Sequence, residues 1–309
     1  MKLKKTLGIL GVTSLAIGLA GCVVNQAPET TSAEVETEMV EEVEEPRLIA
    51  TSYATMQIFD ALGIDLIARS ETAGDLPESY VDLPTVGTAM SPDTEAIVML
   101  EPTDVVGPDT LIETIKPTYD AADIPYTFID LQSVDGLYES ISMLGEKYGK
   151  EEVAEQIVAE YEASMANFQE ALEGETAPRV LVLMGLPGAY IACTPNSYVG
   201  SLVELAGAEN VVQVDTIENF VSWNTEELLA LDPDMILLTA HGLPDLAMEM
   251  FTDEFATNDI WKNFRAVEEY QVFALDYDTF GMSATFAWTK AFDDLTEIFY
   301  GDTYESFID

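Results

Sequence analysis

The sequence predicts an α/β protein of two lobes with mostly parallel sheets, joined by one long α-helix. Short apolar runs alternate with stretches of helical periodicity in both halves of the chain, and this alternation is typical of parallel sheets covered by helices. A proline-free stretch rich in Glu, Ala and Lys separates the halves. We therefore expect an N-terminal α/β lobe at 47–141, a linking helix at 142–174 and a C-terminal α/β lobe at 175–309.

The expected elements follow from apolar runs and helical spacing. In the N-terminal half, the expected strands are 47–51, 103–107 and 126–129, and the expected helices are 56–62 and 111–122. In the C-terminal half, the expected strands are 179–185, 235–240 and 272–275, and the expected helices are 197–206 and 286–300. In the linking stretch, one helix face carries Ile157, Tyr161, Met165 and Phe168.

A short motif occurs once in each half. Residues 94–105 read TEAIVMLEPTDV, and residues 225–236 read TEELLALDPDMI. Glu95 and Glu226 therefore occupy matching positions in two helix–loop–strand units. Such a pattern can arise twice by chance, but its matched placement in two α/β halves favours an internal repeat with equivalent glutamates.

The first residues are typical of a secretion signal. A basic start precedes a short apolar run that ends in LAGC at Cys22, and this run is too short for a comfortable membrane span. The ending resembles the lipobox of bacterial lipoproteins, which implies a signal peptide at 1–21 and lipid on the Cys22 thiol. The alternative is an ordinary secreted protein. Residues 22–46 are rich in Glu and Thr, which predicts a disordered tether.

Charge and residue counts exclude several functions. The chain has 12 Lys plus Arg against 57 Asp plus Glu and a formal net charge of −45, which excludes nucleic-acid binding because the phosphate backbone is also negative. A single histidine, His241, excludes a zinc site built on several histidines. The sequence contains no G-x-S-x-G, H-E-x-x-H, P-loop or G-x-G-x-x-G motif, so we do not expect an enzyme.

Two side chains lie where ligands are commonly bound. His241 directly follows the expected strand 235–240 and precedes Gly242, and ligands of open α/β sheets bind at the carboxyl ends of strands. Its alternative role is a structural histidine hydrogen-bonded to a loop. Met90 precedes Ser91-Pro92-Asp93, which is read as a helix start with proline in the first position. The alternative for Met90 is gap-filling in the core.

This organisation resembles the cobalamin, siderophore and haem receptors of ABC importers, in which two Rossmann-like lobes hold the ligand in the cleft between them. Several stretches resemble most closely the IsdE-type haem-binding lipoproteins, although Ala89 and Leu243 vary within them. These stretches are 86–95, 180–211, 240–245 and 255–267.

The resemblance implies a carrier of haem b (iron protoporphyrin IX). It implies Met90 and His241 as the two iron ligands, and Glu95 and Glu226 as the residues that dock onto the permease. It also implies a monomer anchored by lipid at the extracellular face of the membrane, receiving haem from surface donor proteins.

The haem propionates need donors in a chain with few basic residues. Backbone N–H groups at helix starts can hold anions, and the candidates are Thr51, Ser52, Ser91, Ser197 and Tyr198, for which helix capping is the alternative role. Cys193 ends a short expected strand and is interpreted as a buried apolar residue, with thiolate ligation of haem as the alternative.

Three other functions remain open from the sequence. The first is a receptor for a ferric siderophore or cobalamin. The second is an enzyme, such as one that degrades haem or a metal-dependent hydrolase. The third is a surface lipoprotein that only adheres to a partner, which the paired glutamates do not favour.

Overall fold

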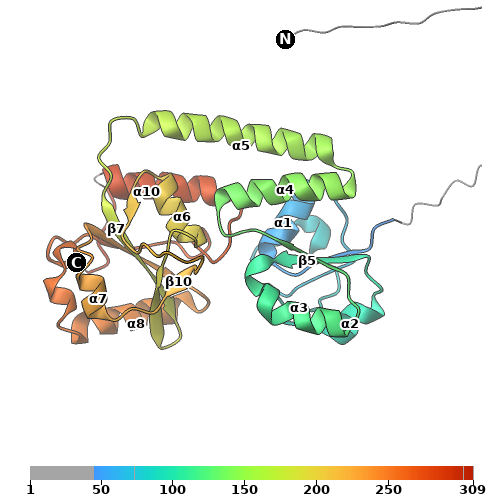
Figure 1. Ribbon diagram of the computed structural model, residues 1–309, viewed down its shortest axis with the longest axis horizontal. Coiled ribbons are helices and arrows are strands. Elements are labelled where there is room, and N and C mark those ends of the chain that lie inside the picture. The colour runs from blue at the N-terminus through green and yellow to red at the C-terminus, as the bar shows by residue number, and fades with distance from the viewer. Residues whose placement is uncertain (1–44, 73, 302, 309) are drawn as a thin grey trace, which may run out of the picture. The chain divides into compact units, whose positions relative to one another are not determined.

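The computed structural model describes residues 45–72, 74–301 and 303–308, and its first sheet confirms the parallel α/β lobe expected in the N-terminal half. The strand order is β2-β1-β5-β6, and each neighbouring pair is parallel (Figure 1). The strands are β1 (Leu48–Ala50), β2 (Ala68–Arg69), β5 (Asp104–Pro108) and β6 (Tyr126–Ile129).

Helices cover both faces of this sheet. Successive residues of a strand point to opposite sides, and apolar residues on both sides of β1 are buried. Leu48 and Ala50 enter the largest hydrophobic cluster, whereas Ile49 between them packs with Ile97 and Ile115. The helices that follow these strands are α1 (Tyr53–Ala61), α2 (Thr94–Met99) and α3 (Ile112–Ala121), with 3₁₀ turns at η1 (Glu78–Tyr80) and η2 (Asp109–Leu111).

The second sheet is parallel at its centre and antiparallel at one edge. Its order is β10-β8-β7-β11-β12, with β9 also paired to β7. The β7–β8 hairpin turns at Pro187-Gly188, where Gly188 has φ 80°, and sequence periodicity does not reveal β9 or β10. The strands are β7 (Arg179–Leu186), β8 (Ala189–Cys193), β9 (Glu209–Asn210), β10 (Phe220–Val221), β11 (Met235–Ala240) and β12 (Val272–Ala274).

The second sheet is also buried on both faces. Val180 and Val182 belong to the largest cluster, and Leu181 and Leu183 belong to a second cluster with Phe251. The helices of this lobe are α6 (Tyr198–Leu205), α7 (Thr225–Leu229), α8 (Pro244–Thr257), α9 (Arg265–Glu268) and α10 (Trp288–Tyr300), with a 3₁₀ turn at η3 (Trp261–Asn263).

The predicted linking helix at 142–174 needs corrected bounds, because the stretch contains two helices, α4 (Val134–Tyr148) and α5 (Glu151–Ala171). Gly149 ends α4 in the left-handed conformation, as is common at helix C-termini. The chain then reverses, and α5 runs beside α4 (Figure 1). A Cβ on Gly145 would lie 2.5 Å from the Ala154 Cβ, so glycine permits this close packing. The longer helix, α5, leads to β7 and spans about 30 Å.

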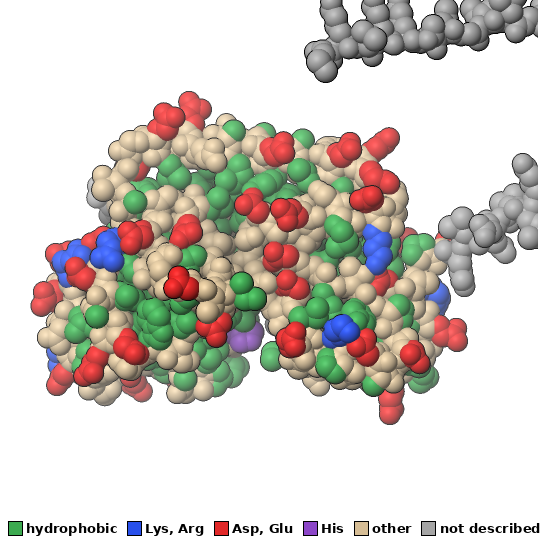
Figure 2. All heavy atoms as spheres, viewed as in Figure 1, with side chains coloured by type: hydrophobic (Ala, Val, Ile, Leu, Met, Phe, Trp, Pro, Cys, Tyr) green, Lys and Arg blue, Asp and Glu red, His purple; other side chains and the backbone are tan. Residues whose placement is uncertain are grey.

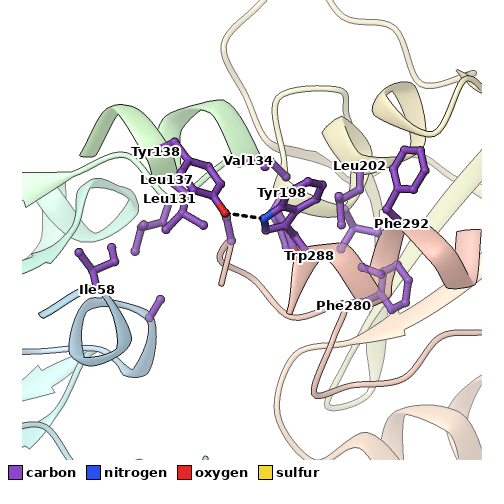
Figure 3. Packing of buried hydrophobic residues seen from close by; sticks show 14 of the residues in the cluster. Ile58, Leu131, Val134, Leu137, Tyr138, Tyr198, Leu202, Phe280, Trp288 and Phe292 are labelled. Carbon is purple, nitrogen blue, oxygen red and sulfur yellow. Dashed lines mark hydrogen bonds between the residues drawn. The ribbon is translucent and has the colours of Figure 1, made fainter. Parts of the chain in front are cut away.

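The lobes are connected by an apolar joint formed by α4, α5 and α10. Trp288 Nε1 donates a hydrogen bond to the Tyr138 hydroxyl at 3.0 Å (Figure 3). Tyr138 stacks on Tyr161 with ring centroids 4.0 Å apart, and Trp288 meets Tyr161 edge-on. The largest hydrophobic cluster therefore continues from one lobe into the other.

None of the helices in the described ranges is both long enough and apolar enough to cross a membrane. The predicted signal peptide at 1–21, the predicted lipidation site Cys22 and all but the end of the predicted tether 22–46 lie outside the described residues.

Candidate ligand site

Met90 lies at the tip of a two-stranded hairpin formed by β3 (Gly87–Thr88) and β4 (Ser91–Pro92). The Glu71 N–H donates to the Gly87 carbonyl at 2.7 Å, which holds the hairpin just beyond the carboxyl end of β2. The Met90 side chain is 64% exposed. Met90 is therefore not a core gap-filler, and its thioether is accessible to a ligand.

Gly87 gives the hairpin its shape. Its φ is 81°, and a Cβ at this position would lie 2.5 Å from the Ser91 carbonyl oxygen and 2.9 Å from the Asp93 nitrogen. Only glycine fits both this conformation and this close approach. Gly87 therefore fixes the position of Met90 through the backbone.

The helix start predicted at Ser91 is wrong. Ser91 and Pro92 form β4, and the Ser91 N–H donates to Thr88 Oγ1 within the hairpin. Asp93 caps α2 by accepting a hydrogen bond from the Ala96 N–H at 3.0 Å. The physical reason is that proline also fits an edge strand, so the Ser-Pro-Asp pattern did not distinguish the two structures.

His241 directly follows β11, as predicted, and its backbone N–H donates to the Gly185 carbonyl at 3.0 Å. Like the Met90 hairpin, it lies beyond the carboxyl end of a parallel strand, but in the other lobe. Figure 2 shows the histidine at the edge of a notch between the atoms of the two lobes.

The imidazole of His241 is in a state suited to binding a metal. Partial burial lowers its pKa from the ordinary value of 6.5, so the ring is neutral at pH 7 and a nitrogen lone pair is available. Among the described residues no hydrogen bond contributes to its pKa shift, which burial alone causes. The structural role that was its alternative is therefore not supported by these neighbours.

The chain after His241 is strained and apolar. Leu243 has a positive φ of 45°, although it precedes Pro244 and a residue before proline avoids the helical regions. Gly242 before it also has a positive φ, at 66°, which glycine adopts without strain. Leu243 is 63% exposed, and Leu246 at the start of α8 is also exposed. Strain of this kind clusters at ligand sites. Sequence analysis named Leu243 only as a variation within a family-like stretch, and it did not name Leu246.

Thr51 and Ser52 are used mainly by the N-terminal lobe itself. Thr51 is buried, and its Oγ1 donates to the Val106 carbonyl at 3.1 Å. Ser52 caps α1 by accepting a hydrogen bond from the Thr55 N–H at 3.1 Å. Both side chains therefore make the packing and capping contacts that were their alternative role. The first N–H groups of α1 have no partner within the helix.

Ser197 and Tyr198 are buried, which removes them from the candidate site. Ser197 caps α6 and donates to the Thr194 carbonyl at 2.7 Å, and the Tyr198 hydroxyl donates to the Thr279 carbonyl. Both are at most 2% exposed. The start of α6 faces the interior because Tyr198 packs in the core. The polar residues at the helix start gave no indication of this burial.

Cys193 is a buried free thiol. Burial raises the pKa of its thiol to about 12, so the thiolate that would bind iron is not formed at pH 7. This supports the interpretation of Cys193 as a small apolar core residue.

Glu95 and Glu226 occupy equivalent positions, which confirms the internal repeat in the backbone. Each is the second residue of its helix and is exposed. The residues before the two prolines, Glu101 and Asp232, both take the left-handed conformation, with φ of 46° and 47°. The two motifs therefore share their unusual backbone geometry as well as their sequence pattern.

A polar bridge between the lobes was missed by sequence analysis. Gln132 Nε2 donates to both carboxylate oxygens of Asp109, at 3.0 and 3.1 Å, and Asn219 Nδ2 donates to Gln132 Oε1. Burial and the charge of Asp130 raise the pKa of the Asp109 carboxyl group. No local motif marks these residues, because the bridge joins segments from different lobes.

The fold and the two loops define a binding protein of two α/β lobes, and the chain belongs to the periplasmic binding protein family, whose model matches residues 48–279. It is 34% identical over 303 residues to the "High-affinity heme uptake system protein IsdE" of Staphylococcus aureus, covering 98% of this chain and 99% of that protein.

Two solved structures are similar to the described fold. The crystal structure of S. aureus IsdE complexed with heme has a TM-score of 0.79 and 35% identity, covering 83% of this chain and 99% of that one. An ABC transporter substrate-binding protein from Listeria monocytogenes EGD-e also has a TM-score of 0.79 and 35% identity, covering 84% of this chain and 100% of that one.

Proposed function

We propose that this chain captures haem and delivers it to the permease of an ABC importer. One observation carries the proposal: an exposed thioether in one lobe and a neutral, partly exposed imidazole in the other both lie beyond the carboxyl ends of parallel strands. The likeness to a haem uptake protein over nearly the whole chain supports it.

The two side chains suit a carrier of haem b rather than a catalyst. Haem iron accepts imidazole nitrogen and thioether sulfur as axial ligands. Met90 has no proton to lose, and burial keeps His241 neutral. With both axial positions filled by protein, the iron has no open position for oxygen chemistry, as transport requires.

The arginines favour haem over an anionic siderophore. A siderophore site needs guanidinium groups that are free to face the ligand. Each arginine here has acceptors within its own lobe, which are Leu100 O for Arg47, Tyr80 O for Arg69, Glu209 for Arg179 and Asp234 for Arg265. The propionates would then be held by backbone N–H groups, for which the start of α1 is the remaining candidate among the helix starts named from the sequence.

Titration with haemin tests this proposal. We expect the wild-type chain to give a sharp, shifted Soret band, and we expect Met90→Ala and His241→Ala each to change the band and to weaken binding by at least about tenfold. Met99→Ala is the matched control, because Met99 is an exposed methionine of the same lobe outside the site. Equal spectra and affinities for all three variants would overturn the ligand assignment.

The proposal includes anchoring at the extracellular face of the membrane through lipid on Cys22. Replacement of Cys22 by serine removes the thiol that would be acylated, so we expect the variant to lose incorporation of labelled palmitate. A variant that still takes up the label would contradict the anchor while leaving haem binding untouched. Upstream surface haem donors and a monomeric state belong to the same proposal.

A further inference from the structure

The methionines of the chain differ sharply in their access to solvent. Among the residues that the structure describes, only Met90, Met99 and Met143 are exposed, with exposed fractions of 64%, 83% and 38%. Met56 and Met184 are at most 1% exposed. The others are partly buried against the hydrophobic clusters, and they are Met165, Met235, Met248, Met250 and Met282. A small oxidant dissolved in water therefore reaches three of these sulfur atoms most readily.

Met90 is the exposed methionine that lies at the candidate ligand site. Met99 ends α2, and Met143 lies on α4. The hairpin that presents Met90 is held by backbone pairing of β3 with β4 and by the hydrogen bond from the Glu71 N–H. None of these contacts uses the Met90 side chain. A chemical change at its sulfur would thus alter the ligand site and leave the fold in place.

No reactive thiol competes for an oxidant in the part of the chain that the structure describes. Cysteine is oxidised as its thiolate, and the rate follows thiolate content and exposure. Cys193 is buried, and burial raises the pKa of its thiol to about 12. The exposed thioether of Met90 is therefore the sulfur at the ligand site that a peroxide meets first.

We propose that Met90 is a reversible oxidation site, at which a peroxide switches off haem capture by the empty chain while bound haem protects the loaded chain. The inference rests on the proposed function. The Met90 sulfur attacks one oxygen of hydrogen peroxide, the O–O bond breaks, and the second oxygen leaves as water. The sulfur loses two electrons and becomes a sulfoxide, and the peroxide is reduced by the same two electrons.

The protection follows because iron and peroxide compete for the same sulfur. A thioether bound to iron has donated a lone pair and lies against the porphyrin, so a peroxide reaches it much more slowly. Once formed, the sulfoxide is larger and polar, and it can no longer make a thioether–iron bond. Loaded chains thus keep their haem under oxidising conditions, whereas empty chains stop taking haem until the sulfoxide is reduced.

The test begins with the empty wild-type chain, which is treated with hydrogen peroxide, freed of peroxide by gel filtration and titrated with haemin. We expect Kd to rise about tenfold, as for Met90→Ala. Methionine sulfoxide reductases A and B together should restore the affinity, because each reduces one sulfoxide epimer. The midpoint of urea denaturation should not change, since Met90 is exposed.

Two matched variants assign the effect to one sulfur. The double variant Met99→Leu/Met143→Leu removes the other exposed methionines of the described residues and should lose haem affinity on peroxide treatment as the wild-type chain does. Met90→Leu keeps both of them, and its weaker haem affinity should be the same before and after treatment.

Peptide mass spectrometry measures the protection. We expect Met90 to be oxidised at least about tenfold more slowly in the haem-loaded chain than in the empty chain. Met99 serves as the internal reference and should be oxidised at the same rate in both, because it lies outside the site.

A chain that carries Met90 sulfoxide and still binds haem with full affinity would overturn the inference. Resistance of Met90 to peroxide in the empty chain, or equal oxidation rates in the empty and loaded chains, would overturn it as well. Failure of the proposed function looks different, because untreated Met90→Ala would then bind haemin as tightly as the wild-type chain, or the wild-type chain would not bind it.

Discussion

The joint between the lobes and the two loops that carry Met90 and His241 are built in opposite ways. At the joint, Trp288 is buried, its indole N–H is hydrogen-bonded to Tyr138, and the surrounding cluster extends through both lobes. The loops expose Met90 and Leu243 and depend on positive φ at Gly87, Gly242 and Leu243. Stability is thus concentrated in the joint, and the loops keep side chains available for a ligand.

The largest expected effect on stability comes from removing Trp288, the side chain at the centre of the joint. Trp288→Ala deletes a large buried ring and leaves the Tyr138 hydroxyl without its donor, so we expect the free energy of unfolding to fall by about 3–5 kcal/mol. Urea denaturation measures the change. Met90→Ala is the comparison variant and should alter stability by less than about 0.5 kcal/mol. A comparable loss in both variants would show that the loops also carry the fold.

A backbone substitution in the hairpin should affect the ligand without touching a ligand atom. Gly87→Ala places a Cβ 2.5 Å from the Ser91 carbonyl oxygen at a residue with φ 81°, so we expect a loss of about 1–3 kcal/mol and displacement of Met90. The Soret band should then resemble that of Met90→Ala. Gly63→Ala is the matched control, because Gly63 also has positive φ but no atom lies within 4 Å of its added Cβ. An unchanged band in Gly87→Ala would refute the positioning role.

Acid should weaken haem binding through the C-terminal loop alone. Burial lowers the pKa of His241 below 6.5, and only the neutral ring binds iron. Affinity should therefore stay constant from pH 8 to about 6.5 and fall below the pKa of His241 by about tenfold per pH unit. Haemin titrations across this range measure the profile, with urea denaturation at each pH as a check that the fold persists. A decline that begins well above pH 6.5 would contradict the lowered pKa.

The smallest expected effect is at Leu243, where we expect a substitution to maintain or raise stability and to lower haem affinity. Leu243→Gly relieves the left-handed strain, so we expect stability to be unchanged or higher by up to about 1 kcal/mol. Removal of an exposed leucine beside His241 should weaken haem binding a few-fold. Urea denaturation and haemin titration of one preparation measure both quantities. A variant that loses both stability and affinity would show that Leu243 supports the loop.

Sequence patterns predicted most of the parallel strands, missed short ones such as β3 and β4, and failed at chain reversals. The expected bounds of β6 and β11 match the structure. For β11 the reason is that a continuous apolar run identifies a strand buried on both faces. The single helix expected at 142–174 is divided because Gly149 takes the left-handed conformation. Charged residues continue on either side of that glycine, so helical periodicity gave no sign of the reversal.

The candidate site was predicted in part. Met90 and His241 were found from local context and family resemblance, and their exposure agrees with the proposed role. Ser197 and Tyr198 were chosen because polar residues precede a helix, yet both are buried. Capping and ligand binding use the same residue types, so only the surroundings of the helix start distinguish them.

The sequence by itself determined the two α/β halves, the repeated glutamates and the single imidazole after a buried strand, because these depend on periodicity, spacing and composition within short segments. Only the tertiary structure decided which helix starts are buried, that Met90 lies at a hairpin tip, and that α4, α5 and α10 form one apolar joint. The physical reason is that burial and contact depend on segments far apart in the chain, such as Tyr138 and Trp288, whose pairing no local pattern encodes.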